Sequence, residues 1–315
     1  GYQAMLVNTT GANNVAVGYQ AMIANTTSPN NVGIGKDSLL TMTSGSGMNT
    51  AVGVGSLQLL TTAANNVAVG FEAAKAITTG NDNTGIGYRA LDANTTGVQN
   101  TATGTEALGA NTTGEQNTAI GREALNSNTT AVRNTAVGVS SLGANTTGND
   151  NTALGKDAMS SNTTGTNQTA LGYQALDAAT TGHRNVALGA GAGGAVTTGE
   201  NNVYIGYLAG NHDILATTGH NNTLIGTYID IAGVGDSTVN GIGYNLSCAS
   251  GYTTLGESAN DIRAAHGTAT WATVSDERYK KDIVDSTAGL SFVNALQPRT
   301  FKYKTLGELP TAFRA

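Results

Sequence analysis

The sequence is short of cysteine and of charge, and each shortage excludes a class of protein. Its single cysteine, Cys248, cannot form a disulfide within the chain. Charged residues make up 11% of the chain, against a usual ~25%, and those in residues 1–274 are mostly acidic, with 16 Asp and Glu against 8 Lys and Arg. A body with this charge balance lacks the basic surface that nucleic-acid binding requires. We therefore expect no nucleic-acid partner.

Long apolar runs and metal-binding patterns are also missing. No run approaches the ~20 apolar residues of a membrane-spanning helix, so we expect no membrane insertion. The histidines share no ligand spacing, and no group of Cys or Asp completes a zinc or calcium site. We therefore expect no metal and no cofactor. The first residues, "GYQAM", already lie inside a repeat, which indicates a piece of a longer protein.

What the sequence has in abundance is one repeated unit, well represented by "NTTGEQNTAIGREAL" at residues 111–125. Each unit has a glycine after a short apolar run, and these anchor glycines are spaced 17 residues apart, with one spacing of 18 and one three-residue insertion near "NHDILATTG". Short, fixed periods are typical of solenoids, in which each coil stacks on the next. The anchors are Gly18, Gly35, Gly53, Gly70, Gly87, Gly104, Gly121, Gly138, Gly155, Gly172, Gly189, Gly206, Gly226 and Gly243.

The residues before the anchor predict a β-strand in each coil. Three residues before it the chain has only Val or Thr, from Val15 to Val203, and one residue before it Val, Ile or Leu, with Thr103 the polar exception. Alternating β-branched residues of this kind indicate a strand with one inward face. After the anchor, Ala or Ser followed by Leu or Met adds a second apolar contact. We predict an all-β fold, a parallel β-solenoid whose stacked coils extend on the order of 65 Å at ~4.8 Å per coil.

Between these two apolar positions stands a residue that is always small, from Ala16 to Ala187, until Tyr204. Strand alternation predicts that this residue points away from the core of its own coil. Because it is small and uncharged, we interpret the row as a place where a second backbone approaches. The simplest such neighbour is another subunit about a threefold axis, which predicts a homotrimer. The alternative is tight packing within one chain.

Polar positions repeat as well. Four residues before the anchor stands Asn, from Asn14 to Asn202, with Gln168 the exception, and such residues stacked in register can form a ladder of amide hydrogen bonds. The "NTT" triplets, as at Asn111, fit the N-glycosylation motif, but we interpret them as Asx turns. Charge falls mainly after the anchor and just before the Asn, so we expect these positions to be the solvent edges of each coil.

The repeat resembles the head repeat of trimeric autotransporter adhesins, whose unit reads roughly "S-V-A-I-G-x-x-S/A". The matching letters within residues 1–250 include "NVAVGYQAM", "NTAIGREAL" and "NTALGKDAM". The resemblance implies a left-handed parallel β-roll in an intertwined homotrimer, with the "NTTG" loop enlarged by the longer period. Similar repeats also occur in phage tail fibres.

The composition changes near residue 275. Residues 275–315 hold 7 Lys and Arg and 5 Asp and Glu, far more charge per residue than the rest. We therefore predict a solenoid over residues 1–250, a transition over 251–274 and a small α+β segment over 275–315. Within the last segment, "STAGLSFVNAL" predicts an amphipathic helix capped by Ser286, and "RTFKYK" predicts a strand.

This last segment resembles the start of the intramolecular chaperone domain that ends many phage tailspikes, endosialidases and tail fibres. The resemblance rests on "SDERYKKDI", which begins at Ser275, and on "LQPRTFKYK". It implies that the segment promotes trimer assembly and then cuts itself off at the Val274–Ser275 bond, with Ser275 as the nucleophile and Lys280 as the base. The alternative is a charged helix start with Ser275 as its cap.

Together these features predict the shaft of a trimeric phage tail fibre, located in the virion, that attaches to a glycan or protein on the host cell surface. Apart from the single cut, we expect no enzyme activity. One alternative is a trimeric adhesin or fibril on a bacterial surface, which should end in a coiled-coil stalk and a membrane barrel instead of "SDERYKKDI". Another is a tailspike that degrades a surface polysaccharide, which requires clustered carboxylates.

Overall fold

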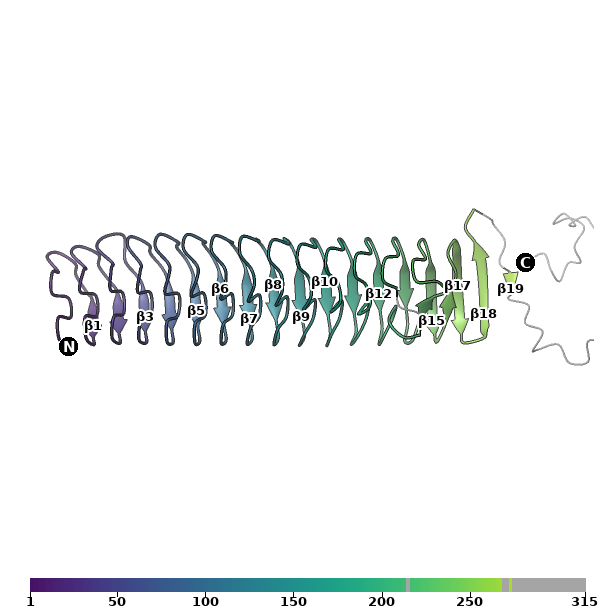
Figure 1. Ribbon diagram of the computed structural model, residues 1–315, viewed down its shortest axis with the longest axis horizontal. Helices are drawn as coiled ribbons and strands as arrows, with labels where there is room; N and C mark the ends of the chain where they lie inside the picture. Colours follow the sequence, from purple (N-terminus) through teal and green to yellow (C-terminus); the bar gives the residue numbers. More distant parts are fainter. Residues whose placement is uncertain (214–215, 268–271, 274–315) are drawn as a thin grey trace, which may run out of the picture. The chain divides into compact units, whose positions relative to one another are not determined.

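The computed structural model describes residues 1–213, 216–267 and 272–273, and in these residues every regular element is a β-strand (Figure 1). One sheet holds 17 of the strands, and β14 and β16 form a second, two-stranded sheet. The strands are β1 Val15–Val17, β2 Val32–Ile34, β3 Thr50–Val52, β4 Val67–Val69, β5 Thr84–Ile86, β6 Thr101–Thr103, β7 Thr118–Ile120, β8 Thr135–Val137, β9 Thr152–Leu154, β10 Thr169–Leu171, β11 Val186–Leu188, β12 Val203–Ile205, β13 Thr223–Ile225, β14 Asp230–Ile231, β15 Asn240–Tyr244, β16 Ser247–Cys248, β17 Tyr252–Glu257, β18 Asn260–Ala265 and β19 Ala272–Thr273.

Each strand of the large sheet lies beside the strand of the next coil, parallel and in register. β7 pairs with β8 so that Ala119 lies beside Ala136. Parallel pairing of this kind runs from β1 to β13 and continues through β15 to β17. The three-residue insertion falls between β12 and β13, where Val203 still pairs with Thr223. The predicted parallel β-solenoid, of about 14 turns, is confirmed.

The small residue of each strand faces the core of its own coil, and the prediction that it faces a second subunit is wrong. Ala119 is fully buried, whereas Ile120 beside it is 43% exposed. The reason lies across the coil, where the Leu or Met after the anchor fills the space above the strand. A Cβ added at Gly33 would lie only 3.1 Å from Cγ of Met22. The alternative interpretation, tight packing within one chain, is the correct one.

The anchor glycine is required because successive coils approach closely there. Gly121 has a φ of +134°, and an added Cβ would lie 2.4 Å from the carbonyl oxygen of Gly138 in the next coil. After the anchor, alternate residues are left-handed, with φ of 57° at Glu123 and 51° at Leu125. These residues form a second ladder between coils, in which the Leu125 N–H donates to the carbonyl of Ser141 at 3.0 Å. Each coil therefore has two layers, a strand and a returning segment that follows the anchor, with a thin core between them.

The predicted ladder of asparagines is confirmed by the hydrogen bonds. Both the backbone N–H and Nδ2 of Asn117 donate to Oδ1 of Asn100, at 3.0 and 3.2 Å. Nδ2 also donates to the carbonyl of Ala131, at 2.8 Å. Because Asn117 is fully buried, these bonds replace the hydrogen bonds to water that its amide loses on folding. The ladder therefore stabilises the stack from coil to coil.

A second ladder is formed by the asparagines of the "NTT" triplets, which sequence reasoning assigned only to turns. Nδ2 of Asn128 donates to Oδ1 of Asn111 at 2.7 Å and closes an Asx-type turn on the carbonyl of Ala131 at 3.2 Å. Burial of the amides leaves no room for a glycan on the folded coil, which supports the interpretation of these triplets as turns. The fully buried members are Asn25, Asn94, Asn111, Asn128, Asn145 and Asn162.

Gln168, the exception in the first ladder, connects the two ladders. Its Oε1 accepts from Nδ2 of Asn185 at 3.1 Å, as an asparagine would, while its Nε2 reaches Oδ1 of Asn162 at 3.0 Å. Asn162 needs this donor because the next coil has Ala179 where the second ladder would continue. The two departures from the repeat therefore compensate each other.

The Gln168→Asn variant is expected to be less stable than the wild type by about 1–3 kcal/mol, because it leaves the buried Oδ1 of Asn162 without a donor. Equilibrium urea unfolding followed by circular dichroism measures the loss. Adding Ala179→Asn should restore the missing donor and most of the stability. Equal unfolding midpoints for Gln168→Asn and the wild type would show that the connection contributes nothing.

Tyr204 is the other large departure, since it is fully buried where most coils have Ala or Gly. The adjoining returning segments have Gly193 and Gly210 in place of Leu or Met. A Cβ at either glycine would lie within 2.7 Å of the Tyr204 ring. The ring therefore occupies the space that leucine side chains fill elsewhere.

The parallel stack ends in an antiparallel hairpin. β17 pairs in parallel with β15, and β18 then pairs with β17 in the antiparallel direction, from Tyr252 opposite Ala265 to Glu257 opposite Asn260. β19 adds to β18 in the same antiparallel manner. This reversal covers the last parallel edge, which would otherwise present unpaired backbone groups.

Candidate functional surfaces

The predicted cleavage site lies outside the described residues. This holds for Val274, Ser275 and Lys280, and for the predicted helix and strand of the 275–315 segment. The geometry that bears on function is therefore that of the solenoid, whose strands, turns and returning segments present different side chains.

The outward side of the strands carries a row of aliphatic residues one position before the anchor, beside a row of Val and Thr three positions before it. We call it the outer strand face, and it consists of the residues one and three positions before each anchor. Ile120 and Leu154 are 43% and 50% exposed, although both are the kind of residue found in cores. Thr103 is the polar residue in the row that otherwise has Val, Ile or Leu one position before the anchor. The exposed large members are Val15, Val17, Ile34, Val69, Ile86, Ile120, Leu154, Val186, Leu188 and Ile242.

Aromatic side chains border this face at the position after the anchor. Tyr2 stacks on Tyr19 with ring centroids 5.5 Å apart, and Phe71 stacks on Tyr88 at 5.6 Å. Each of these rings is at least 46% exposed. Aromatic residues are enriched at protein interfaces, so the border extends the apolar surface instead of separating it from solvent.

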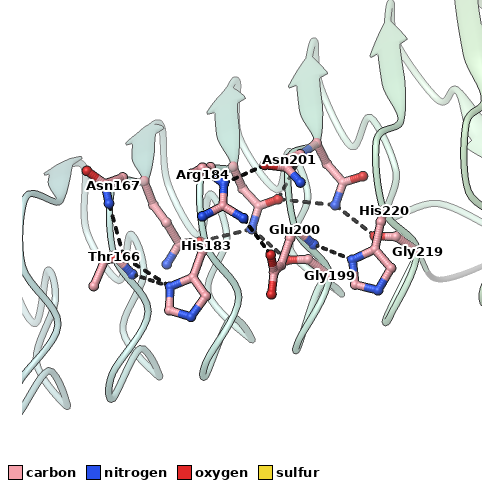
Figure 2. A network of polar contacts seen from close by, with 12 residues as sticks. Thr166, Asn167, His183, Arg184, Gly199, Glu200, Asn201, Gly219 and His220 are labelled. Atoms are coloured by element: carbon pink, nitrogen blue, oxygen red, sulfur yellow. Dashed lines mark hydrogen bonds and ion pairs between the residues drawn. The ribbon is translucent and has the colours of Figure 1, made fainter.

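A polar network connects the turns that precede β10, β11, β12 and β13 (Figure 2). Nδ1 of His183 accepts the backbone N–H of Thr166 at 3.0 Å, and Nδ1 of His220 accepts that of Glu200 at 3.0 Å. In an earlier coil Oδ1 of Asn149 makes the same bond to a backbone N–H, at 2.8 Å. These two histidines therefore act as acceptors that hold one coil to the next, and the bonds require Nδ1 to carry no proton.

The charged members of the network also link neighbouring coils. Arg184 donates to Oδ1 of Asn201 at 2.6 Å and to a carboxylate oxygen of Glu200 at 2.7 Å (Figure 2). Arg133 binds Asp150 in the same way, and this hydrogen bond lowers the pKa of the Asp150 carboxyl. Exposed pairs of this kind contribute little individually. We interpret them as solvent-side contacts between coils.

Reactive groups are scarce in the described part of the chain. Burial raises the pKa of the Cys248 thiol to about 11, so it is protonated at neutral pH and a poor nucleophile. Within residues 1–213, 216–267 and 272–273, no set of three or more His, Cys, Asp or Glu side chains is grouped so as to hold a metal ion. The same residues contain no helix long and apolar enough to span a membrane.

Comparison with known proteins gives one match, which lies in the C-terminal segment. The family described as chaperone of endosialidase matches residues 275–312. No curated protein and no solved structure matches the chain. The match coincides with the segment whose "SDERYKKDI" resembles an intramolecular chaperone, and it leaves the function of the solenoid to be inferred from its own surfaces.

Proposed function

We propose that the chain is the shaft of a trimeric phage tail fibre or tailspike-type protein that serves attachment to a host cell. The observation that supports this best is the outer strand face, where Val, Ile or Leu one position before the anchor is exposed in many of the coils. Exposed apolar residues gathered along one face mark interaction sites in soluble proteins. In this proposal the partners are two further copies of the same chain.

The length of the outer strand face allows contacts between chains along the whole stack. Three-residue strands stacked about 65 Å deep make a strip roughly 10 Å wide, or roughly 650 Å² per chain. Because each chain of a trimer has two neighbours, this gives roughly 325 Å² per partner in each contact, below the ~800 Å² of a standard interface, so the three contacts must act together. About a threefold axis, one edge of each chain's face meets the other edge of the next chain's face, so a closed trimer can cover the face.

The C-terminal segment supplies the second support for assembly and for a phage origin. Its family is named for the endosialidase chaperone, and the residues that match it include Ser275 and Lys280. In the proposed maturation, the Ser275 hydroxyl attacks the carbonyl carbon of Val274 and the backbone amine leaves, which gives an ester. Lys280 takes the hydroxyl proton and returns it to the amine, and water then hydrolyses the ester. A lysine desolvated in an assembled trimer can be neutral and so act as this base.

The complete gene product is expected to trimerise and then be cut once, between Val274 and Ser275. Light scattering should give the mass of three chains, and mass spectrometry should find a mature chain ending in "TATWATV" beside a released peptide beginning "SDERYKK". Ser275→Ala removes the nucleophile and should stay full length while still forming a trimer. Lys280→Ala should also stay full length.

The assignment of the chain as a trimeric shaft and the cleavage roles of Ser275 and Lys280 can be refuted separately. A trimer that stays uncut would refute the assigned roles of Ser275 and Lys280 without affecting the shaft. A monomeric complete product would refute the shaft itself. Cleavage that persists in Ser275→Ala would show that a different group attacks the bond.

A further inference from the structure

The returning segments carry two adjoining hollows on the layer opposite the outer strand face. Their volumes are about 250 and 320 Å³. They share Asn126, which belongs to the coil between them, and we call the two hollows together the groove. The first is lined by Arg89, Asp92, Glu106, Gly109, Ala110 and Asn126. The second is lined by Glu123, Asn126, Ser127, Ser140, Gly143 and Ser160.

The hollows exist because two coils have glycine where their neighbours have a side chain. Gly109 and Gly143 stand five residues after their anchors, the position that Asn126 and Ser160 occupy in the coils between and beyond them. Neither glycine has a positive φ, so the backbone does not require glycine at these two positions. A Cβ at Gly109 would lie 3.2 Å from the carbonyl oxygen of Glu106, a tight contact, and 3.6 Å from Oδ1 of Asp92. Because Asn126 and Ser160 carry a Cβ at the same position of their coils, the coil accepts one there, and its absence leaves space.

The groups around the groove suit a ligand rich in hydroxyls. Asn126 and the serines can each donate and accept a hydrogen bond, Arg89 donates, and the carboxylates accept. Nε of Arg89 lies 3.2 Å from Oδ2 of Asp92. Burial raises the pKa of the Asp92 carboxyl, against the lowering effect of Arg89. Arg122, beside the groove, pairs with Glu123 at 2.7 Å, so the three lining carboxylates of Asp92, Glu106 and Glu123 face two cations. The groove is therefore weakly acidic, which disfavours a phosphate- or carboxylate-bearing ligand.

We propose that this groove binds an uncharged polysaccharide, with alternate sugar units in the hollows at Gly109 and Gly143. The two glycines are two coils apart, about 9.6 Å along the stack, a span that a disaccharide unit covers. The groove lies opposite the outer strand face, so the proposed trimer leaves three copies of it open to solvent. Binding through several copies multiplies weak contacts by avidity. The inference rests on the proposed attachment function and names the class of receptor.

The test is retention of the full chain on an array of immobilised oligosaccharides. The array carries uncharged probes (glucan, mannan, galactan and N-acetylglucosamine oligomers) and anionic ones (hyaluronate and polysialic acid). The wild type is expected to be retained on at least one uncharged probe. The Gly109→Asn, Gly143→Asn double variant fills both hollows with a side chain that Asn126 already carries at this position. It should bind that probe at least about tenfold more weakly.

A matched control adds the same side chains elsewhere on the same coils. Val98→Asn with Val132→Asn changes a row in which Asn81 and Asn149 occur naturally, and it should bind as the wild type does. Unchanged binding by the glycine double variant overturns the inference, as does retention on anionic probes alone or on no probe. Degradation of the bound oligosaccharide, detected by mass spectrometry, would overturn simple binding in favour of a hydrolase. Light scattering of the same samples reports the trimer separately, so a trimer that binds no uncharged probe refutes the groove and not the shaft.

Discussion

The Ile120→Asp, Leu154→Asp double variant is expected to stay a monomer under conditions in which the wild-type chain forms a trimer. Both side chains lie on the outer strand face, where one chain alone leaves them 43% and 50% exposed. In the proposed trimer, each chain would bring two carboxylates into an apolar contact. Unpaired charges buried in this way cost several kcal/mol each. Light scattering at matched concentrations should give the mass of one chain.

Two controls separate assembly from folding. Asn126→Asp with Ser160→Asp places the same charges on the same two coils, but on the returning segments, and should leave the trimer intact. Ile120→Thr with Leu154→Thr reproduces what Thr103 already does in its own coil, and should weaken the trimer without abolishing it. The circular dichroism of all variants should keep the wild-type β signal. A trimer formed by the aspartate variant would contradict the assignment of this face to assembly.

Replacing Tyr204 by alanine is expected to lower the free energy of unfolding by about 3–5 kcal/mol, the range for deleting a buried aromatic ring. The loss should be at the upper end because the adjoining Gly193 and Gly210 have no side chain to fill the cavity. Urea unfolding of the variant and the wild type measures it. Local loosening should centre on β12, since coils of a solenoid contact mainly their neighbours.

A leucine at position 193 tests whether Tyr204 occupies the space that leucine fills in other coils. Gly193→Leu alone should also be destabilising, because its Cβ would meet the Tyr204 ring at 2.7 Å. Combined with Tyr204→Ala, the same leucine should fill the space that it fills in other coils and recover at least half of the loss. Its φ of 59° is close to the 51° that Leu125 adopts at the equivalent position, so the backbone accepts it. Additive losses in the double variant would show that the ring and the glycine do not share one space.

The periodic residues were enough to predict the coil length, the strand positions and the asparagine ladder. They were not enough to predict which side chains of each strand face the core. With three residues per strand, an inward pair flanking a small outward residue and the reverse have the same sequence. The choice depends on the returning segment, where a side chain such as Leu125 must have space, and only Ala or Gly opposite provides it. Exposed residues such as Ile120 therefore look like core residues in the sequence.

The candidate groove was hidden for a similar reason. In a chain with 43 glycines, Gly109 and Gly143 cannot be told in the sequence from the glycines that the turns and anchors of the repeat require. What distinguishes them is an ordinary backbone conformation at a position where neighbouring coils carry side chains. That distinction needs φ values and the packing of three successive coils, neither of which a single sequence contains. The compensation between Gln168 and Ala179 is likewise visible only once the two ladders are placed side by side.

The stacking of nearly identical coils makes the register of the stack ambiguous during folding. A chain of nearly interchangeable coils can skip one, loop out 17 residues and still place each strand against a similar partner, so the regular coils alone specify the stack poorly. The irregular coils break this degeneracy. Tyr204 fits only beside coils that lack the leucine, and Gln168 has its full set of bonds only where Ala179 follows. These residues therefore fix the register of the stack. A misaligned stack would leave a cavity or an unpaired buried amide at each of them.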